Sequence, residues 1–173
     1  MTDGDSAYID IAKRAVESYV KKGEEIDVSD APEEIRDRRA GAFVCLKIGG
    51  ELRGCIGTIR PATESLAEEI RNNAISSAMT DPRFIPVRPT ELDSLQYSVD
   101  ILEEPEDIPD ISHLDPTKYG VIVRSGIKTG LLLPDLEGVE TAEEQVRIAS
   151  MKAGIRKGEP VQLQRFKVTR HDR

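Results

Sequence analysis

The chain has 173 residues, 38% of them hydrophobic, and a formal net charge of −8. This length is sufficient for a packed core, so we expect one domain or two closely packed subdomains. No basic block offsets the acidic excess, which argues against a nucleic-acid partner. The chain has no long apolar span, no charged-then-apolar leader and only two cysteines. These features predict a cytoplasmic protein without a membrane segment.

The first predicted element is an amphipathic helix over residues 6–22. Apolar residues recur there every three or four positions, Ser6 is a suitable N-cap and Gly23 a suitable stop. The charged segment 24–39 that follows predicts a solvated loop with a short helix at residues 33–38.

Residues 42–58, AFVCLKIGGELRGCIGT, predict a β-hairpin that turns at Gly49-Gly50. A two-residue loop there pairs Val44 with Cys55 and therefore places Cys45 and Cys55 on opposite faces. Cys45 is then a small buried hydrophobe, and the two cysteines are not expected to bond to each other. A register slip of one residue, such as a bulge, would reverse that expectation.

Cys55 is the strongest candidate for chemistry. Arg53 is expected to lie beside it on the same face, where a guanidinium would stabilise the thiolate, the form that acts as a nucleophile. Gly54 and Gly57 weaken the strand and leave room for a ligand to approach the sulfur. Two simpler interpretations stay open, because a strand cysteine often only packs and Arg53 could pair with Glu51 on the surface.

The remaining elements follow in two groups. After the hairpin we expect a helix over residues 64–79, a rigid turn at Asp81-Pro82-Arg83-Phe84, a strand over 95–102 and an acidic loop or linker over 103–110. Beyond these we expect strands at 120–124, 131–133 and 161–168, a helix from a Thr141 cap to Gly154, and a loose tail over residues 169–173.

No standard catalytic or metal motif is present. Two histidines and two cysteines do not make a four-ligand zinc pattern, and no cofactor is evident. A carboxylate-rich Mg²⁺ or Ca²⁺ site is left open, although no loop has the required spacing. A base for Cys55 would have to come from His113 or His171, brought near by the fold, or from a carboxylate such as Asp81 or Glu51.

The hairpin sequence Leu52-Arg-Gly-Cys-Ile-Gly-Thr58, preceded by Ala42-Phe-Val-Cys-Leu46, resembles the signature of the AMMECR domain family. Later blocks resemble the family in the same order: Asp81-Pro-Arg-Phe84, Pro86-Val87, Gly120-Val-Ile-Val123, Gly130-Leu-Leu-Leu-Pro134 and Lys152-Ala-Gly154. The match spans nearly the whole chain.

The resemblance implies a single AMMECR-type domain over residues 1–173, with an α+β fold, an antiparallel sheet, flanking helices and a smaller subdomain. It places the functional site in a cleft lined by residues 53–57. It also implies a prokaryotic setting with a Memo-like protein and a radical S-adenosylmethionine protein. Two positions depart from the pattern: Cys45, where threonine is usual, and Ser150, where a second cysteine is common.

Two hypotheses of function follow. The favoured one is a cytoplasmic binding or accessory module, in which the candidate ligand-binding residues are Gly54, Ile56, Gly57, Asp81, Arg83 and Lys152. It predicts that Cys55→Ser leaves binding intact and Arg53→Ala abolishes it. The alternative is a thiol-dependent enzyme, with Cys55 as nucleophile or acceptor and Arg53 as its electrostatic activator. It predicts that Cys55 alkylates much faster than Cys45.

Overall fold

The computed structural model describes residues 3–172, and these divide into two compact units. The first unit runs to Leu102 and resumes at Thr169, and the second spans Glu103–Val168. Each unit has its own four-stranded sheet and its own apolar core. The predicted α+β class, with antiparallel pairing, flanking helices and a smaller second part, is confirmed.

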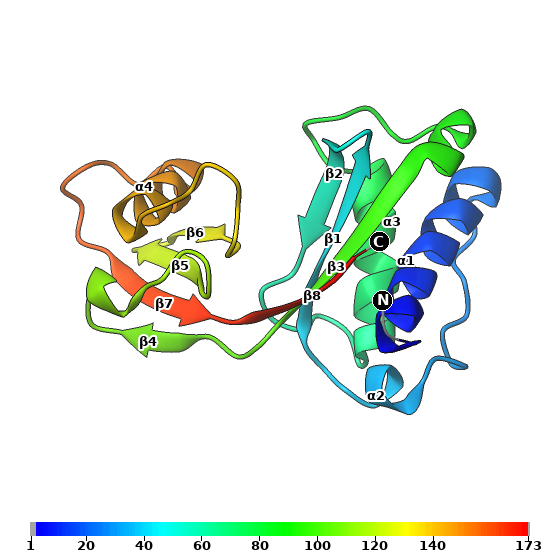
Figure 1. Ribbon diagram of the computed structural model, residues 1–173, viewed down its shortest axis with the longest axis horizontal. Coiled ribbons are helices and arrows are strands. Elements are labelled where there is room, and N and C mark those ends of the chain that lie inside the picture. Colours follow the sequence, from blue (N-terminus) through cyan, green and yellow to red (C-terminus); the bar gives the residue numbers. More distant parts are fainter. Residues whose placement is uncertain (1–2, 173) are drawn as a thin grey trace. The chain divides into compact units, whose positions relative to one another are not determined.

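The first unit contains most of the helices (Figure 1). Its elements are α1 (Asp3–Lys22), α2 (Glu33–Arg36), β1 (Gly41–Ile48), β2 (Glu51–Gly57), α3 (Leu66–Met79), the 3-10 helix η1 (Pro89–Ser94), β3 (Leu95–Leu102) and β8 (Val168–Asp172). The strands lie in the order β2-β1-β3-β8, which makes β2 an edge strand. Helix α1 begins at Asp3, so Ser6 lies inside the helix and is not its cap.

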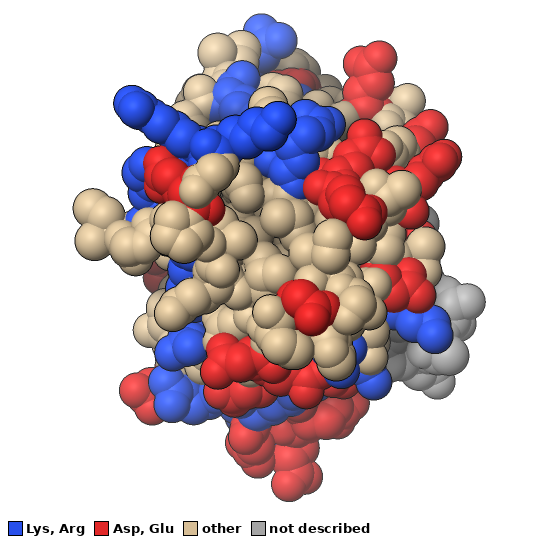
Figure 2. Space-filling model, turned by 90° about the vertical axis from the view of Figure 1, so that its left-hand side faces the viewer, with Lys and Arg blue, Asp and Glu red and all other residues tan. Residues whose placement is uncertain are grey.

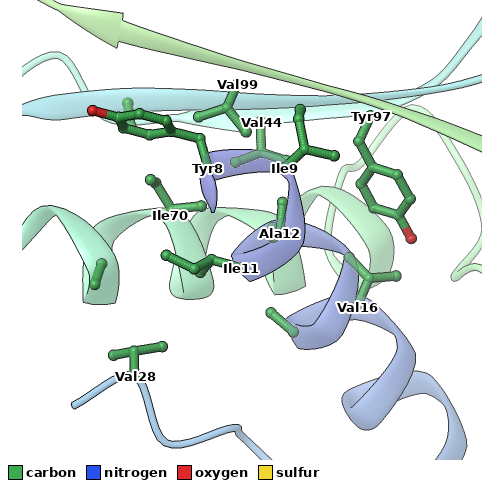
Figure 3. Close-up of a cluster of buried hydrophobic side chains, with 14 of the residues drawn as sticks. Tyr8, Ile9, Ile11, Ala12, Val16, Val28, Val44, Ile70, Tyr97 and Val99 are labelled. Carbon is green, nitrogen blue, oxygen red and sulfur yellow. The ribbon is translucent and has the colours of Figure 1, made fainter. Parts of the chain in front are cut away.

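Helices α1 and α3 cover one face of this sheet. Along β1, Ala42, Val44 and Leu46 are fully buried, whereas the alternating Phe43 and Cys45 are only half-buried. The period of two is that of a strand with one face on the core. Figure 3 shows side chains of α1, α3 and the sheet pointing toward one another in this core.

The second unit repeats the arrangement on a smaller scale. Its elements are β4 (Glu106–Ile108), the 3-10 helix η2 (Ile111–His113), β5 (Gly120–Ser125), β6 (Lys128–Leu132), α4 (Ala142–Ala153) and β7 (Gln162–Phe166), with strand order β4-β7-β5-β6. Thr141 caps α4 through the Glu144 N–H, and Gly154 ends it with a positive φ of 73°, as predicted. The acidic stretch 103–110 is not only a loop, because β4 within it pairs with β7.

The tail predicted to be loose is an ordered strand. Residues up to Asp172 form β8, next to β3 in the first sheet, whereas Arg173 lies outside the described residues. Arg170 pairs with the buried Asp100 through two contacts, Nε to Oδ1 at 2.8 Å and Nη2 to Oδ2 at 2.9 Å. His171 stacks on Tyr8, with ring centroids 3.9 Å apart. The prediction failed because every partner of this segment is remote in sequence.

Helix α3 and the turn after it carry a buried polar stripe that faces the hairpin. Its members are Glu69, Asn73 and Ser77, which lie four residues apart on one face of α3, and Asp81, which follows in the turn after the helix. The Glu69 carboxylate accepts hydrogen bonds from the hydroxyls and backbone N–H groups of the segment that follows β2. Because the Glu69 carboxylate is buried, it needs such partners to offset its desolvation cost.

Ser77 joins the two strands of the hairpin. Its hydroxyl accepts the Ile56 N–H at 2.8 Å and lies 2.6 Å from the Val44 carbonyl oxygen, to which it donates. A Cβ at Gly54 would collide with the Ser77 carbonyl oxygen, so the helix approaches this closely only because residue 54 is glycine. Gly54 therefore has a packing role.

We expect Ser77→Ala to lower the free energy of unfolding by about 1–3 kcal/mol, because the Ile56 N–H and the Val44 C=O lose their buried partner. Ser76→Ala is the matched control, since Ser76 is the half-buried neighbour in the same helix, and we expect its effect to stay within about 0.5 kcal/mol. Urea unfolding followed by circular dichroism measures both. Equal stability of the two variants would contradict the bridging role.

Candidate functional site

Cys45 and Cys55 lie directly opposite each other on β1 and β2. Their Cα atoms are 4.1 Å apart and their sulfurs form a disulfide. The prediction that they point to opposite faces and do not bond is therefore wrong. Both residues are half-buried and lie on the sheet face opposite to the helices. In the disulfide, Cys55 has no thiolate.

The reason is a β-bulge in the hairpin. Leu46 pairs with Gly54, but the next pair is Lys47 with Leu52, so Arg53 is an extra residue in β2. One extra residue shifts every later side chain of a strand to the other face. The structure therefore has the bulge and register slip that the sequence left open.

The turn after α3 binds the backbone of Cys55 at the outer edge of the sheet. The Cys55 N–H donates to Asp81 Oδ2 at 2.9 Å, and the Cys55 carbonyl accepts from Arg83 Nη2 at 3.2 Å. Arg83 also pairs with Asp81, Nη2 to Oδ2 at 2.8 Å. Cys45 and Cys55 form a non-hydrogen-bonded pair, so both backbone groups of Cys55 point away from β1. Asp81 and Arg83 bind these groups in the place where a further strand would pair.

Asp81 is 4% exposed and ionised. The hydrogen bond from the Arg83 side chain is the main reason that its pKa lies well below the ordinary value, and the Cys55 N–H adds to the effect. The pairing also raises the pKa of Arg83. A carboxylate held in this way is an acceptor for the turn and is a poor general base.

Arg53 pairs with Glu91 of η1. The fork is bidentate, with Nε to Oε2 at 2.9 Å and Nη2 to Oε1 at 3.1 Å, and only 12% of the Arg53 side chain is exposed. The Phe84 ring lies beside both guanidiniums, with its centroid 6.0 Å from Arg53 Cζ and 5.5 Å from Arg83 Cζ. The positive charge of Arg53 is therefore compensated by a carboxylate, not by a sulfur.

The other predicted site residues are distributed as follows. Gly57 lies under the ring of Phe43, which would collide with any Cβ there, and the Ile56 N–H is bound by Ser77. Lys152 belongs to α4 of the second unit, where its Nζ donates to the Leu131 carbonyl at 2.9 Å. The structure therefore brings Arg53, Cys55, Asp81 and Arg83 together in the first unit, with Gly54, Ile56 and Gly57 supporting them.

Sequence reasoning missed three residues of the candidate site. They are Cys45, Glu91, and Phe84, whose ring lies beside two arginines. The sequence held one local signal for Glu91, because Arg88 and Glu91 are three residues apart on either side of Pro89. In the structure the Arg88 N–H donates to Glu91 Oε1 at 3.0 Å. No local signal linked Glu91 to Arg53, which is 38 residues earlier.

One pocket of the first unit lies away from these residues. A pocket of about 320 Å³ is lined by Lys13, Glu17, Leu92, Asp93, Leu95, Gln96 and Tyr97, none of which is a predicted site residue. The Tyr97 hydroxyl beside it is buried and has no hydrogen-bond partner among residues 3–172. Burial raises the pKa of this hydroxyl, and the charge of Glu17 adds to the rise. Because the oxygen is shielded, it offers no direct contact to a ligand. The residues around Cys55 therefore remain the candidate site.

Other features of the described chain bear on the alternatives. Among residues 3–172, no three His, Cys, Asp or Glu side chains gather in a way that would hold a metal ion. None of the helices described is both long and apolar enough to cross a membrane. Figure 2 shows one face on which basic side chains form a band along the upper edge and acidic ones gather at the right and lower edges. Further basic side chains lie along the left and lower edges of the same view, among acidic ones. The absence of a nucleic-acid partner stays a prediction.

The fold and the site define a class: small α+β proteins of two sheet-and-helix units, with an Arg-Gly-Cys-Ile-Gly edge strand anchored to an Asp-Pro-Arg-Phe turn. The AMMECR1 family model matches residues 9–171. The chain belongs to the AMMECR1 family, as the sequence resemblance predicted.

Relatives cover most of the chain. A protein of Thermotoga maritima is 54% identical over 171 residues, which is 97% of this chain and 98% of that protein. The Clostridium acetobutylicum protein CA_C1420 is 50% identical over 166 residues, or 95% of this chain, but the match spans only 35% of that longer protein. The crystal structure of Pyrococcus horikoshii PH0010 has a TM-score of 0.89 at 33% identity, and the match covers 98% of this chain and 92% of that one.

The Arg53–Glu91 pair predicts a pH dependence of stability. The hydrogen bond from Arg53, aided by the Arg88 N–H, lowers the pKa of Glu91 from 4.5 to about 2. Because the folded pKa is the lower one, the contribution is complete above about pH 4.5 and is lost as the pH falls toward about 2. We expect Glu91→Gln to remove about 1–3 kcal/mol at neutral pH and to flatten the curve in this window.

Urea unfolding at a series of pH values measures this dependence. Glu51→Gln is the matched control, because Glu51 is an exposed carboxylate at the start of β2. A Glu91→Gln protein whose stability falls with pH as steeply as that of the wild type would show that the pair does not carry the effect.

Proposed function

We propose that this protein is a binding or accessory module that docks a partner protein through residues 82–88, the docking loop, beside the Arg-Gly-Cys-Ile-Gly strand. One observation supports the proposal above all: the loop is exposed at its tips and anchored at its base. Arg83 and Arg88 have side chains 55% and 70% exposed, and Ile85 is 68% exposed. Arginine with an apolar neighbour is a common composition of interface hot spots.

The anchors hold the loop in one conformation. Asp81 is buried and bound to Cys55, and the buried Val87 donates its N–H to the Ala78 carbonyl at 2.8 Å. Phe84 lies half-buried between the two anchors, against the Arg53 and Arg83 guanidiniums. A loop held in this way loses little conformational entropy on binding, which favours recognition.

The chemistry of the loop suggests the chemistry of the partner. Two exposed guanidiniums fit carboxylates, and Ile85 fits an apolar recess between them. The family resemblance suggests a Memo-like protein and a radical S-adenosylmethionine protein as partners, and we propose the cytoplasm as the place of assembly. The cleft along residues 53–57 is part of the same proposal.

The alternative, a thiol-dependent enzyme built on Cys55, has less support. Its nucleophile is bonded to Cys45, and its supposed activator Arg53 is paired with Glu91. Of the two candidate bases, His171 stacks on Tyr8.

We expect Arg83→Ala to weaken binding of the Memo-like protein from the same genome by about tenfold or more, because an interface arginine is lost. Isothermal titration calorimetry with the purified proteins measures the dissociation constant. Arg14→Ala is the matched control, because Arg14 is a partly exposed arginine of α1 that pairs with a nearby aspartate, as Arg83 does.

A second variant separates contact from folding. Ile85→Ser changes an exposed side chain that makes no anchor, so it should weaken binding while the melting temperature stays near that of the wild type. Unchanged affinity in both Arg83→Ala and Ile85→Ser would rule out the docking loop as the interface.

A further inference from the structure

We propose that Cys45 and Cys55 form a reversible dithiol–disulfide pair that exchanges with low-molecular-weight or protein disulfides. This modification site goes beyond the proposed docking function and does not depend on it. The pair lies in the first unit, on the sheet face opposite to the helices.

The backbone holds the two cysteines opposite each other without help from the sulfurs. Strand β1 is paired on one side with β2 and on the other with β3, where Ser98 is the partner of Cys45. Cys55 is fixed from outside by Asp81 and Arg83. Breaking the sulfur–sulfur bond therefore leaves the two thiols facing each other, and closing it again is an intramolecular reaction with a high effective concentration.

The sulfurs are also placed where a reactant can approach. Cys45 and Cys55 are both half-buried, whereas their neighbours Val44 and Leu46 on the opposite face are fully buried. The next residue across the sheet on their face is the small Ser98. A disulfide of purely structural use would gain from being enclosed, but this one is half-buried and joins the edge strand β2 to β1.

One cation lies close to the pair. The exposed Lys47 is two residues after Cys45 on the same strand face, whereas the Arg83 guanidinium, which binds the Cys55 carbonyl oxygen, is paired with the Asp81 carboxylate. Positive charge favours the thiolate, which is the form that attacks a disulfide. We assign the first attack to Cys55, because it lies on the edge strand β2, and the resolving step to Cys45 on the internal strand β1.

The reaction balances without a metal or an external electron carrier. The Cys55 thiolate attacks one sulfur of a disulfide RSSR, forms a mixed disulfide and releases RS⁻. Cys45 gives its proton to solvent, and its thiolate attacks the Cys55 sulfur and releases the second RS⁻. In sum, the protein dithiol and RSSR become the protein disulfide and two RSH, and the reverse reaction reduces the pair.

The test is a glutathione titration of the full chain. Samples are equilibrated at a series of reduced-to-oxidised glutathione ratios, quenched with acid, alkylated after denaturation and weighed by intact-mass spectrometry. We expect the doubly alkylated form to be replaced by the disulfide form in one reversible transition. The fraction alkylated should fall by about tenfold or more across the series, with little glutathione adduct at any ratio.

Cys45→Ser supplies the diagnostic control, because it removes the resolving thiol. In this variant Cys55 should accumulate as a stable mixed disulfide with glutathione, whereas Cys55→Ser should form that adduct more slowly at Cys45. Circular dichroism melting of both variants checks that they are folded.

Two results would overturn the proposal. One is a wild-type disulfide that survives the most reducing mixture in the folded protein, which would make it structural. The other is a pair of free thiols or glutathione adducts at every ratio, which would show that the two cysteines do not react with each other. Neither result bears on partner binding through residues 82–88, so the two proposals fail separately.

Discussion

The contact between α3 and the β1–β2 hairpin is the constraint from which the rest of the first unit follows. A helix can lie this close to a sheet edge only if the backbone groups that it covers find partners. Glu69, Asn73 and Ser77 supply those partners from one face of α3, and Asp81 supplies another from the turn that follows. Gly54 leaves the space for the approach. The buried polar side chains are therefore what allows α3 to pack closely against the hairpin.

The candidate site is the end of that contact. Where α3 stops, the chain turns through Asp81 and Arg83, and these two side chains bind the backbone of Cys55 at the open edge of the sheet. The edge is thus blocked against pairing with another strand. The same turn projects Arg83 and Ile85 into solvent, so the protection of the edge and the exposure of residues 82–88 have a common structural origin.

Local patterns predicted the elements well and their long-range partners poorly. The caps Thr141 and Gly154 were readable because capping depends on residues within one helical turn. The bulge at Arg53 was not, because the pairing of Leu46 with Gly54 and of Arg53 with Glu91 depends on packing from elsewhere in the chain. One inserted residue was enough to turn two separated cysteines into a bonded pair.

The sequence by itself determined the class of fold, the order of most elements and the family, because periodicity, caps and an ordered set of motifs are local properties. It also directed the search for a candidate site to the hairpin and to the turn from Asp81 to Phe84. Only the tertiary structure decided which groups meet: Cys45 with Cys55, Arg53 with Glu91, and the last strand beside β3 through Arg170 and Asp100. Those pairings depend on register and on contacts between residues far apart in the chain, which no local pattern specifies.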